Sequence, residues 1–319
     1  MTLSDVRKPV GPAIQRGLRR EKAGLILRNW ELYLFLLPTL AYFLIFHYGP
    51  MYGAQIAFKD FYASRGILGS PWVGLKHFER FFRSFQFWTL IRNTIVLSFY
   101  QLGAGFPVPI ILALLLNQLR SPKLKRVVQT VTYAPHFISV VVLVGMMSVF
   151  LSPRSGLVNA AIQSFGGEPV YFMARAHWFR HLYVWSGVWQ RAGWSTIVYL
   201  AALSAISPDL HEAAIVDGAT KLQRIVHIDI PGILPTAVIL LILNMGRVMR
   251  LGFEKAFLMQ NALNLETSEI IPTYVYKTRL LNAQYSFSAA VGLFNAVINL
   301  ILLLAVNRAA KQLGQTSLW

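Results

Sequence analysis

Six long apolar stretches constrain this chain more than any other feature of its sequence. A lipid bilayer requires about 20 consecutive, mostly apolar residues for each helical span. The stretches are apolar on all sides, whereas the strands of a membrane β-barrel alternate over segments of about ten residues. The sequence therefore predicts an all-α integral membrane protein with six transmembrane helices, at residues 33–51, 93–117, 128–151, 182–206, 233–253 and 287–306.

Composition agrees with this class. Hydrophobic residues make up 55% of the 319 residues and charged residues 13%, against about 25% charged in a soluble domain. The net charge of +17 would suggest nucleic acid in a soluble protein. In a membrane protein we expect the basic residues to bind anionic lipid headgroups, and we expect no nucleic-acid partner. Because cysteine is absent, disulfides, thiolate metal sites and thiol catalysis are excluded.

Positive charges predict the orientation. Basic residues cluster in the N-terminal tail and between Arg120 and Arg126, in the loop after the second span, and such clusters favour the cytoplasmic side. Six spans return the C-terminus to the same side. We thus predict a cytoplasmic tail at 1–32, a transmembrane domain at 33–306 with a cytoplasmic loop at 207–231, and a cytoplasmic tail at 307–319.

No catalytic machinery is visible in the sequence. The fragment nearest to a phosphate-binding loop, Gly218 to Lys221, lacks the first glycine and its spacing. The seven histidines show no metal-ligand spacing. We therefore expect no catalytic residue, no metal and no cofactor in this chain, and ATP would have to be hydrolysed by another subunit.

Charged residues within the predicted spans are the functional candidates. None of the 13 acidic residues falls inside a span, which argues against the alternative of an ion-coupled secondary carrier. Arg191 lies near the middle of the fourth span, and Arg247 and Arg250 lie in the outer part of the fifth. An unpaired arginine is costly in hydrocarbon, so each should face a cavity, a partner or an acceptor.

Structural explanations for these arginines stay open. Arg247 and Arg250 could extend to the outer headgroups, and Arg191 could bond to a backbone broken at Gly187 and Gly193. In the second span, glycines and prolines must interrupt the helix, which suits either a cavity lining or a packing kink. They are Gly103, Gly105, Pro107 and Pro109.

The loop at 207–231 is polar but ordered. Ser207 or Asp209 can cap a first short helix, Gly218 supplies a turn, and Pro231 is predicted to end a second helix before the next span. Its apolar residues form a surface too small for a core. We predict two short helices that form an amphipathic knob on the cytoplasmic face.

The spacing within this loop is specific. Glu212-Ala213-Ala214, three residues, Gly218, nine residues and then a segment from Ile228 to Pro231 resemble the "EAA" loop in the membrane subunits of bacterial ATP-binding-cassette (ABC) importers. Only Ile230 departs from the usual leucine. The resemblance covers nearly the whole chain and is strongest to the carbohydrate-uptake subfamily related to the maltose importer. Within it, the chain resembles permeases for acidic oligosaccharides, including the alginate importer.

This resemblance implies a type I importer permease fold in the bacterial inner membrane. The loop would be a coupling helix seated on an ATPase dimer that binds ATP and Mg, with Glu212 pairing with a basic ATPase residue. A second, related permease and an extracytoplasmic binding protein complete the implied assembly. The implied coupling residues are Glu212, Ala213, Ala214, Asp217, Gly218, Ile228 and Pro231.

The cargo is predicted from charge. The outer loop at 52–83 carries five basic residues against two acidic ones, so a positive vestibule could draw an acidic oligosaccharide, or could dock a binding protein or the membrane surface. We predict a translocation path that includes a possible sugar-stacking tryptophan and polar residues of the fourth and fifth spans. These residues are Trp189, Gln190, Arg191, Asn244, Arg247 and Arg250.

Overall fold

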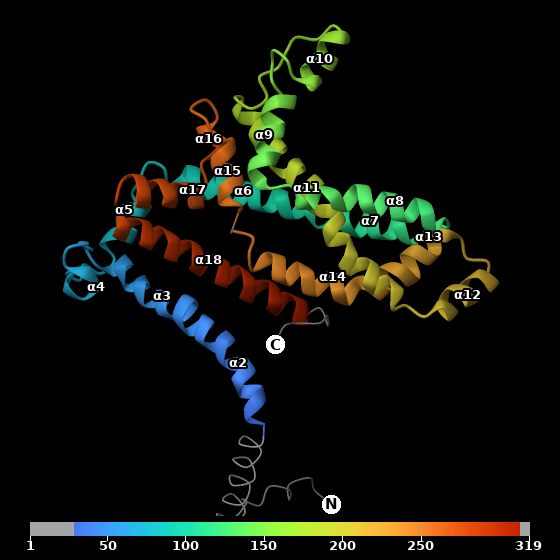
Figure 1. The fold of residues 1–319 in the computed structure, drawn as a ribbon, viewed down its shortest axis with the longest axis horizontal. Helices are drawn as coiled ribbons and strands as arrows, with labels where there is room; N and C mark the ends of the chain where they lie inside the picture. Colours follow the sequence, from blue (N-terminus) through green and yellow to red (C-terminus); the bar gives the residue numbers. More distant parts are fainter. Residues whose placement is uncertain (1–28, 250, 313–319) are drawn as a thin grey trace, which may run out of the picture. The chain divides into compact units, whose positions relative to one another are not determined.

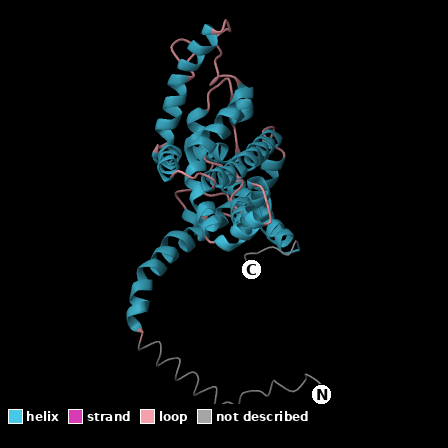
Figure 2. Ribbon diagram, turned by 90° about the vertical axis from the view of Figure 1, so that its right-hand side faces the viewer, coloured by secondary structure: helices cyan, strands magenta, loops and turns pink. Residues whose placement is uncertain are grey.

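A computed structural model describes residues 29–249 and 251–312, and this part of the chain is helical with no extended sheet (Figures 1 and 2). Its only strand-like pairing is an isolated bridge between Lys59 and Trp72. The chain divides into two compact units at Gln55 and Ile56, and each is described by itself. The all-α membrane class is confirmed for the described residues.

The first unit contains one long apolar helix. It consists of α2 (Trp30–Phe43), a π-helical segment η1 (Leu44–Tyr48) and α3 (Gly49–Met51), and it leads into a 3₁₀ segment η2 (Tyr52–Phe58). No side chain of α2, η1 or α3 is buried. A helix that is apolar on all sides suits a lipid environment.

The second unit is built around α11. This helix contacts α6, α7, α8 and α14, and its buried Val184 and Val188 belong to a core cluster with Leu97 and Met259. The helices of this unit are α4 (Gly66–Gly69), α5 (Lys76–Phe82), α6 (Phe87–Gly105), α7 (Pro107–Asn117), α8 (Pro122–Tyr133), η3 (Ala134–Phe137), α9 (Val140–Phe150), α10 (Leu157–Ser164), α11 (Ala176–Ser204), α12 (Pro208–Val216), α13 (Lys221–Arg224), η4 (Ile225–Asp229), α14 (Ile230–Met245), α15 (Phe253–Met259), α16 (Leu265–Ser268), α17 (Ile271–Tyr276), η5 (Lys277–Leu281) and α18 (Tyr285–Gln312).

Four helices in the described residues are long and apolar enough to cross a membrane, and a bent pair would make five. The four are Trp30–Phe58, Phe87–Asn117, Lys221–Met245 and Tyr285–Gln312. The fourth predicted span, at 182–206, corresponds to α11, whose 29 residues extend about 44 Å at 1.5 Å per residue. Because α11 carries many polar side chains, it is not among the helices that are apolar enough to cross a membrane. Apolarity alone therefore does not reproduce the six predicted transmembrane helices.

The third predicted span, at 128–151, is not one continuous helix. Pro122–Phe137 and Val140–Phe150 meet at an angle of 102°. Pro135 lies just before the break, and the hydroxyl of Ser139 accepts a hydrogen bond from the backbone N–H of Val142 at 3.3 Å, which caps α9. Proline interrupts the helical hydrogen bonds and serine starts a new helix, so the chain turns here.

The fifth predicted span is displaced along the chain. Its helix begins at Lys221 rather than at residue 233 and ends at Met245 rather than at residue 253. Pro231 therefore does not end a helix. The wider π-helical turn η4 ends at Asp229, two residues before Pro231, and accommodates a residue without an N–H. As a result Asp229 lies inside the long helix, and Arg247 lies beyond its end.

The fourth helix is unbroken at its glycines. α11 is continuous through Gly187 and Gly193, so Arg191 does not bond to a broken backbone there. Gly193 instead permits close packing, because a methyl group at this position would collide with the carbonyl of Thr132 in α8. Glycine is required here by the distance between two helix backbones.

We predict that Gly193→Ala lowers the thermal stability of the purified protein in detergent. Overpacking at such a contact costs about 1–3 kcal/mol. Gly103→Ala is the matched control, because no atom lies within 4 Å of the added methyl group and alanine is the better helix former. A melting temperature of Gly193→Ala equal to or above that of the unchanged protein would contradict the packing contact.

Candidate functional site

The loop predicted at 207–231 contains two helical segments, α12 and α13. The hydroxyl of Ser207, not Asp209, caps α12 by accepting from the backbone N–H of Asp209 at 3.3 Å. Gly218 adopts φ +77°, the left-handed conformation that favours glycine at a helix end. Thr220 and Gln223 form a capping box that starts α13. The turn chemistry read from the sequence therefore shapes this loop.

α12 presents an open surface at one end of the second unit, opposite α5 and α17 (Figure 1). None of its side chains is buried, and its exposed apolar residues are Leu210, Ile215 and Val216. Glu212 is exposed and forms no ion pair with any described residue. Of the other implied coupling residues, Ala213, Asp217, Gly218 and Pro231 are exposed and Ala214 and Ile228 are partly exposed.

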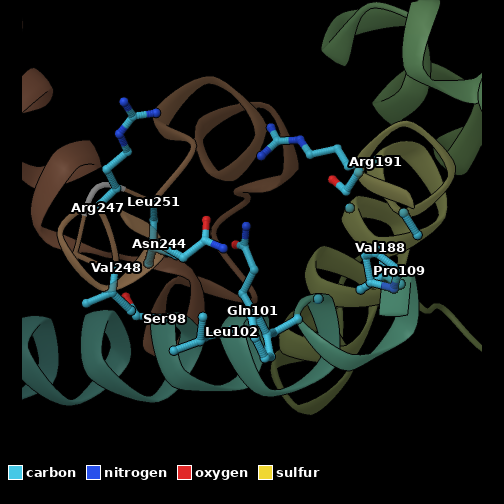
Figure 3. Close-up of a pocket in the computed structure, with 15 residues that line it drawn as sticks. Ser98, Gln101, Leu102, Pro109, Val188, Arg191, Asn244, Arg247, Val248 and Leu251 are labelled. Carbon is cyan, nitrogen blue, oxygen red and sulfur yellow. The ribbon is translucent and has the colours of Figure 1, made fainter. Parts of the chain in front are cut away.

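A cavity of about 340 Å³ lies among four segments of the second unit (Figure 3). It is lined by α6, by the junction of α6 with α7, by α11, and by the end of α14 with the residues that follow it. Gly105 and Pro109 of the interrupted second span belong to the lining. The interruption therefore occurs where irregular backbone is tolerated, beside a cavity.

The lining is cationic and polar. Arg191 and Arg247 stand on opposite sides of the cavity, and the amides of Gln101 and Asn244 project between them (Figure 3). No acidic residue lines the cavity, and neither arginine forms an ion pair among the described residues. The field of the two guanidinium groups is thus not cancelled by a carboxylate at the site.

Two lining residues of α6 carry polar atoms without partners. The hydroxyl of Ser98 and the Oε1 atom of Gln101 are buried and make no hydrogen bond with described residues. Buried polar atoms are normally paired, so each has hydrogen-bonding capacity that the described residues leave unused. Sequence reasoning missed both residues, because a serine and a glutamine in an apolar helix carry no strong signal. Their spacing of three, on one helix face, is the sequence pattern that could have found them.

Only some of the residues predicted to form the translocation path line this cavity. Arg191, Asn244 and Arg247 line the same cavity. Gln190 is buried and its Nε2 donates to the carbonyl of Ile138 at 2.7 Å, where it satisfies the backbone at the break before α9. Trp189 is half exposed and lies outside the lining. Arg250 lies outside the described residues.

A third cation lies behind the cavity wall. Lys255 is buried, and its Nζ donates to the carbonyl of Tyr183 at 2.6 Å. A Cβ atom on Gly187, a lining residue, would lie 3.2 Å from this Nζ. Burial, with the charge of Arg191 second, lowers the pKa of Lys255 to about 7.

The outer loop is less cationic than its sequence suggests. Lys76 Nζ lies 2.7 Å from Asp60 Oδ2, and this hydrogen bond is the main cause that lowers the pKa of the Asp60 carboxyl. Lys59 is buried and donates to the carbonyl of Ile67 at 2.7 Å. Two of the five basic residues are therefore already occupied within the loop.

These features define a helical membrane protein with a ligand-sized polar cavity and an exposed loop helix at one end. The chain belongs to the family described as binding-protein-dependent transport system inner membrane components, whose model matches residues 105–314. Its members are permease subunits of ABC transporters, in which a separate subunit hydrolyses ATP, so the chain itself is not an enzyme. The resemblance inferred from the EAA spacing is confirmed, and the ion-coupled carrier gains no support.

Two relatives from Bacillus subtilis (strain 168) match along nearly their full length. The chain is 46% identical over 321 residues to the polygalacturonan/rhamnogalacturonan transport system permease protein YteP, with 100% of both chains covered. It is 42% identical over 313 residues to the protein LplB, with 98% of both chains covered.

The fold is similar to that of a solved permease. A chain in the crystal structure of a bacterial ABC transporter involved in the import of the acidic polysaccharide alginate matches with a TM-score of 0.86 and 42% identity, over 92% of this chain and 99% of that chain. The alginate transporter in complex with an alginate pentasaccharide-bound periplasmic protein matches equally well, with a TM-score of 0.86. The predicted type I importer permease fold is confirmed.

The charge of the cavity can be measured with thiol reagents, because the chain has no cysteine. For each cysteine variant, the measured quantity is the rate of reaction with an anionic methanethiosulfonate divided by the rate with a cationic one. We predict that this ratio is about tenfold higher for Ser195→Cys, in the lining, than for Ser204→Cys, an exposed control on the same helix. The two arginines should concentrate the anion. An equal ratio at the two positions would contradict a cationic cavity.

Proposed function

We propose that this chain is the permease subunit of an importer that moves an acidic oligosaccharide across the cytoplasmic membrane. The observation that carries the proposal is the cavity with Arg191 and Arg247 on opposite sides and no acidic residue in its lining. Guanidinium groups bind carboxylates with strong, directional hydrogen bonds. Uronate residues carry one such carboxylate per sugar, whereas a neutral sugar offers none.

The neutral groups of the cavity suit the rest of such a ligand. Ser98, Gln101, Ser195 and Asn244 provide hydroxyl and amide groups, which hydrogen-bond sugar hydroxyls. The names of the relatives point in the same direction, since one concerns polygalacturonan and rhamnogalacturonan and another alginate. Arg250 is proposed to extend the cationic path, and Trp189 and Gln190 to support it from the neighbouring turn of α11.

The assembly is proposed from the loop and the family. α12 would seat in an ATPase subunit, where its open apolar residues and Glu212 meet an apolar groove and a basic side chain. The cavity is lined by residues of this chain alone, and a second, related permease would complete the translocation path. An extracytoplasmic binding protein would deliver the oligosaccharide, as the complex of the alginate transporter with a periplasmic protein supports. Both termini would be cytoplasmic.

We predict that Glu212→Lys lowers the amount of ATPase that co-purifies with the permease by about tenfold or more, since reversing one partner of an interfacial charge pair adds repulsion to the lost contact. Asp209→Lys is the matched control, because Asp209 is an exposed acid of the same helix. Retention of the ATPase by Glu212→Lys would exclude the proposed pairing.

We predict that Arg191→Ala and Arg247→Ala each reduce uptake of uronate oligosaccharides by about 10-fold to 100-fold at limiting concentration, because a hydrogen bond to a charged group contributes about 1.5–3 kcal/mol. Uptake is measured in vesicles that contain the whole transporter. Uptake of neutral oligosaccharides in the same vesicles should change little. Unimpaired uptake of both kinds of sugar by both variants would defeat the assignment of an acidic cargo.

A further inference from the structure

Asp229 is the only acidic side chain among the described residues that is fully buried. It lies in η4, within the long helix that leads from the loop into α14. Its Oδ2 accepts a hydrogen bond from Nε2 of Gln118 at 3.2 Å, and its Oδ1 lies 3.4 Å from Nε2 of His211. Gln118 is the C-cap residue of α7, and His211 belongs to α12. One carboxylate of η4 thus contacts two other helical elements.

α12 has few other connections to the spanning helices. It buries no side chain, and among the described residues the 3.4 Å contact of His211 with Asp229, an ion pair when the imidazole is protonated, is its only polar side-chain contact with another helix. The backbone joins it to its neighbours through Ser207 and through the turn at Gly218. Such turns are the usual places where a chain absorbs rotation. Motion of α12 would be lost in these turns without a side-chain link.

The cluster around Asp229 is incompletely paired. Its Oδ1 has the 3.4 Å contact with His211 but accepts no hydrogen bond, and the nearby Nε of Arg224 is buried without an acceptor. Buried polar atoms are normally satisfied, so an acceptor and a donor here are free to engage when the elements move. A buried carboxylate also interacts strongly with its neighbours because water does not screen it.

We propose that Asp229 is a positioning residue that transmits motion of α12 to α7 and α14 through His211 and Gln118. The inference rests on the proposed function, in which an ATPase subunit moves α12. Displacement of His211 changes the position of the Asp229 carboxylate. Asp229 belongs to the long helix that includes α14, and its carboxylate is hydrogen-bonded to Gln118 at the end of α7. The cytoplasmic ends of two helices that line the cavity then move together.

The test uses the complete importer in vesicles and measures oligosaccharide uptake and ATP hydrolysis in the same preparation. Asp229→Asn keeps the size of the side chain and removes its charge. We expect ATP hydrolysis to continue and uptake per ATP to fall about tenfold, within the usual range of coupling between sites. His211→Ala should cause a similar loss. The double variant should be no worse than either single variant, because both changes break the same contact.

His227→Ala is the matched control. This second histidine of the loop is exposed, and its only described hydrogen bond is to the carbonyl of Gln223, in its own helix, at 2.9 Å. Any effect of His227→Ala should therefore multiply with that of Asp229→Asn, as independent effects do. Should Asp229→Asn fail to assemble, His211→Ala alone decides, since His211 is partly exposed and its loss leaves no cavity in the core.

The inference is overturned if uptake per ATP is unchanged in Asp229→Asn and His211→Ala, or if the two losses multiply in the double variant. Failure of the proposed function gives a different result. In that case the unchanged importer shows no ATP-dependent uptake of oligosaccharide. If the unchanged importer and the two variants all show the same uptake per ATP, the proposed role of Asp229 is refuted and the proposed function stands.

Discussion

The packing of α11 is the constraint on which the second unit depends. Val184, Val188 and Ala192 follow one another at intervals of four and face the core. Gly187, Arg191 and Ser195 follow the same interval and line the cavity, together with Val188 and Ala192 at the boundary between core and cavity. Because an α-helix places residues four apart on one face, a single helix supplies both surfaces. Its close contact with α8 at Gly193 fixes its distance from α8 and so helps to position both faces.

This double role explains why α11 is the least apolar of the long helices. A helix that faces only lipid or other apolar helices carries an apolar surface on every side, as α2 does. α11 instead carries an arginine toward a cavity and a buried glutamine, Gln190, toward the broken backbone before α9. Polar groups are tolerated at membrane depth when each has a partner or faces a cavity. Length therefore identifies this helix better than hydropathy does.

The sequence predicts what depends on local chemistry. Ser207 caps α12, Gly218 takes a left-handed conformation, and five of the six apolar stretches fall on helices or on a broken pair, while the fifth extends past the end of its helix at Met245. It also placed Arg191, Asn244 and Arg247 together as path residues, because charges in apolar surroundings are rare. The prediction that a helix ends at Pro231 was wrong. The helix continues through this proline because the preceding π-helical turn accommodates a residue without an N–H.

Contacts between distant segments could not be predicted in this way. Gln118 and Asp229 are 111 positions apart, and Gln190 and Ile138 are 52 positions apart. No local pattern signals either pair. Lys255 illustrates the same limit: it follows a predicted span by two residues and reads as an ordinary loop cation. Only the fold shows that it is buried behind Gly187, beside the cavity.

The electrostatics of the cavity follow from these long-range placements. Two arginines and no carboxylate line it, with the buried Lys255 behind its wall, so the two guanidinium groups repel each other in a way that an internal acid would have cancelled. An internal acid would also compete with an anionic ligand for the same guanidinium groups. Because no acid pairs with the arginines, their N–H groups can donate hydrogen bonds to a ligand. An anion that binds there also relieves the repulsion between the guanidinium groups. The absence of acids from the lining therefore leaves both guanidinium groups available to an anionic ligand.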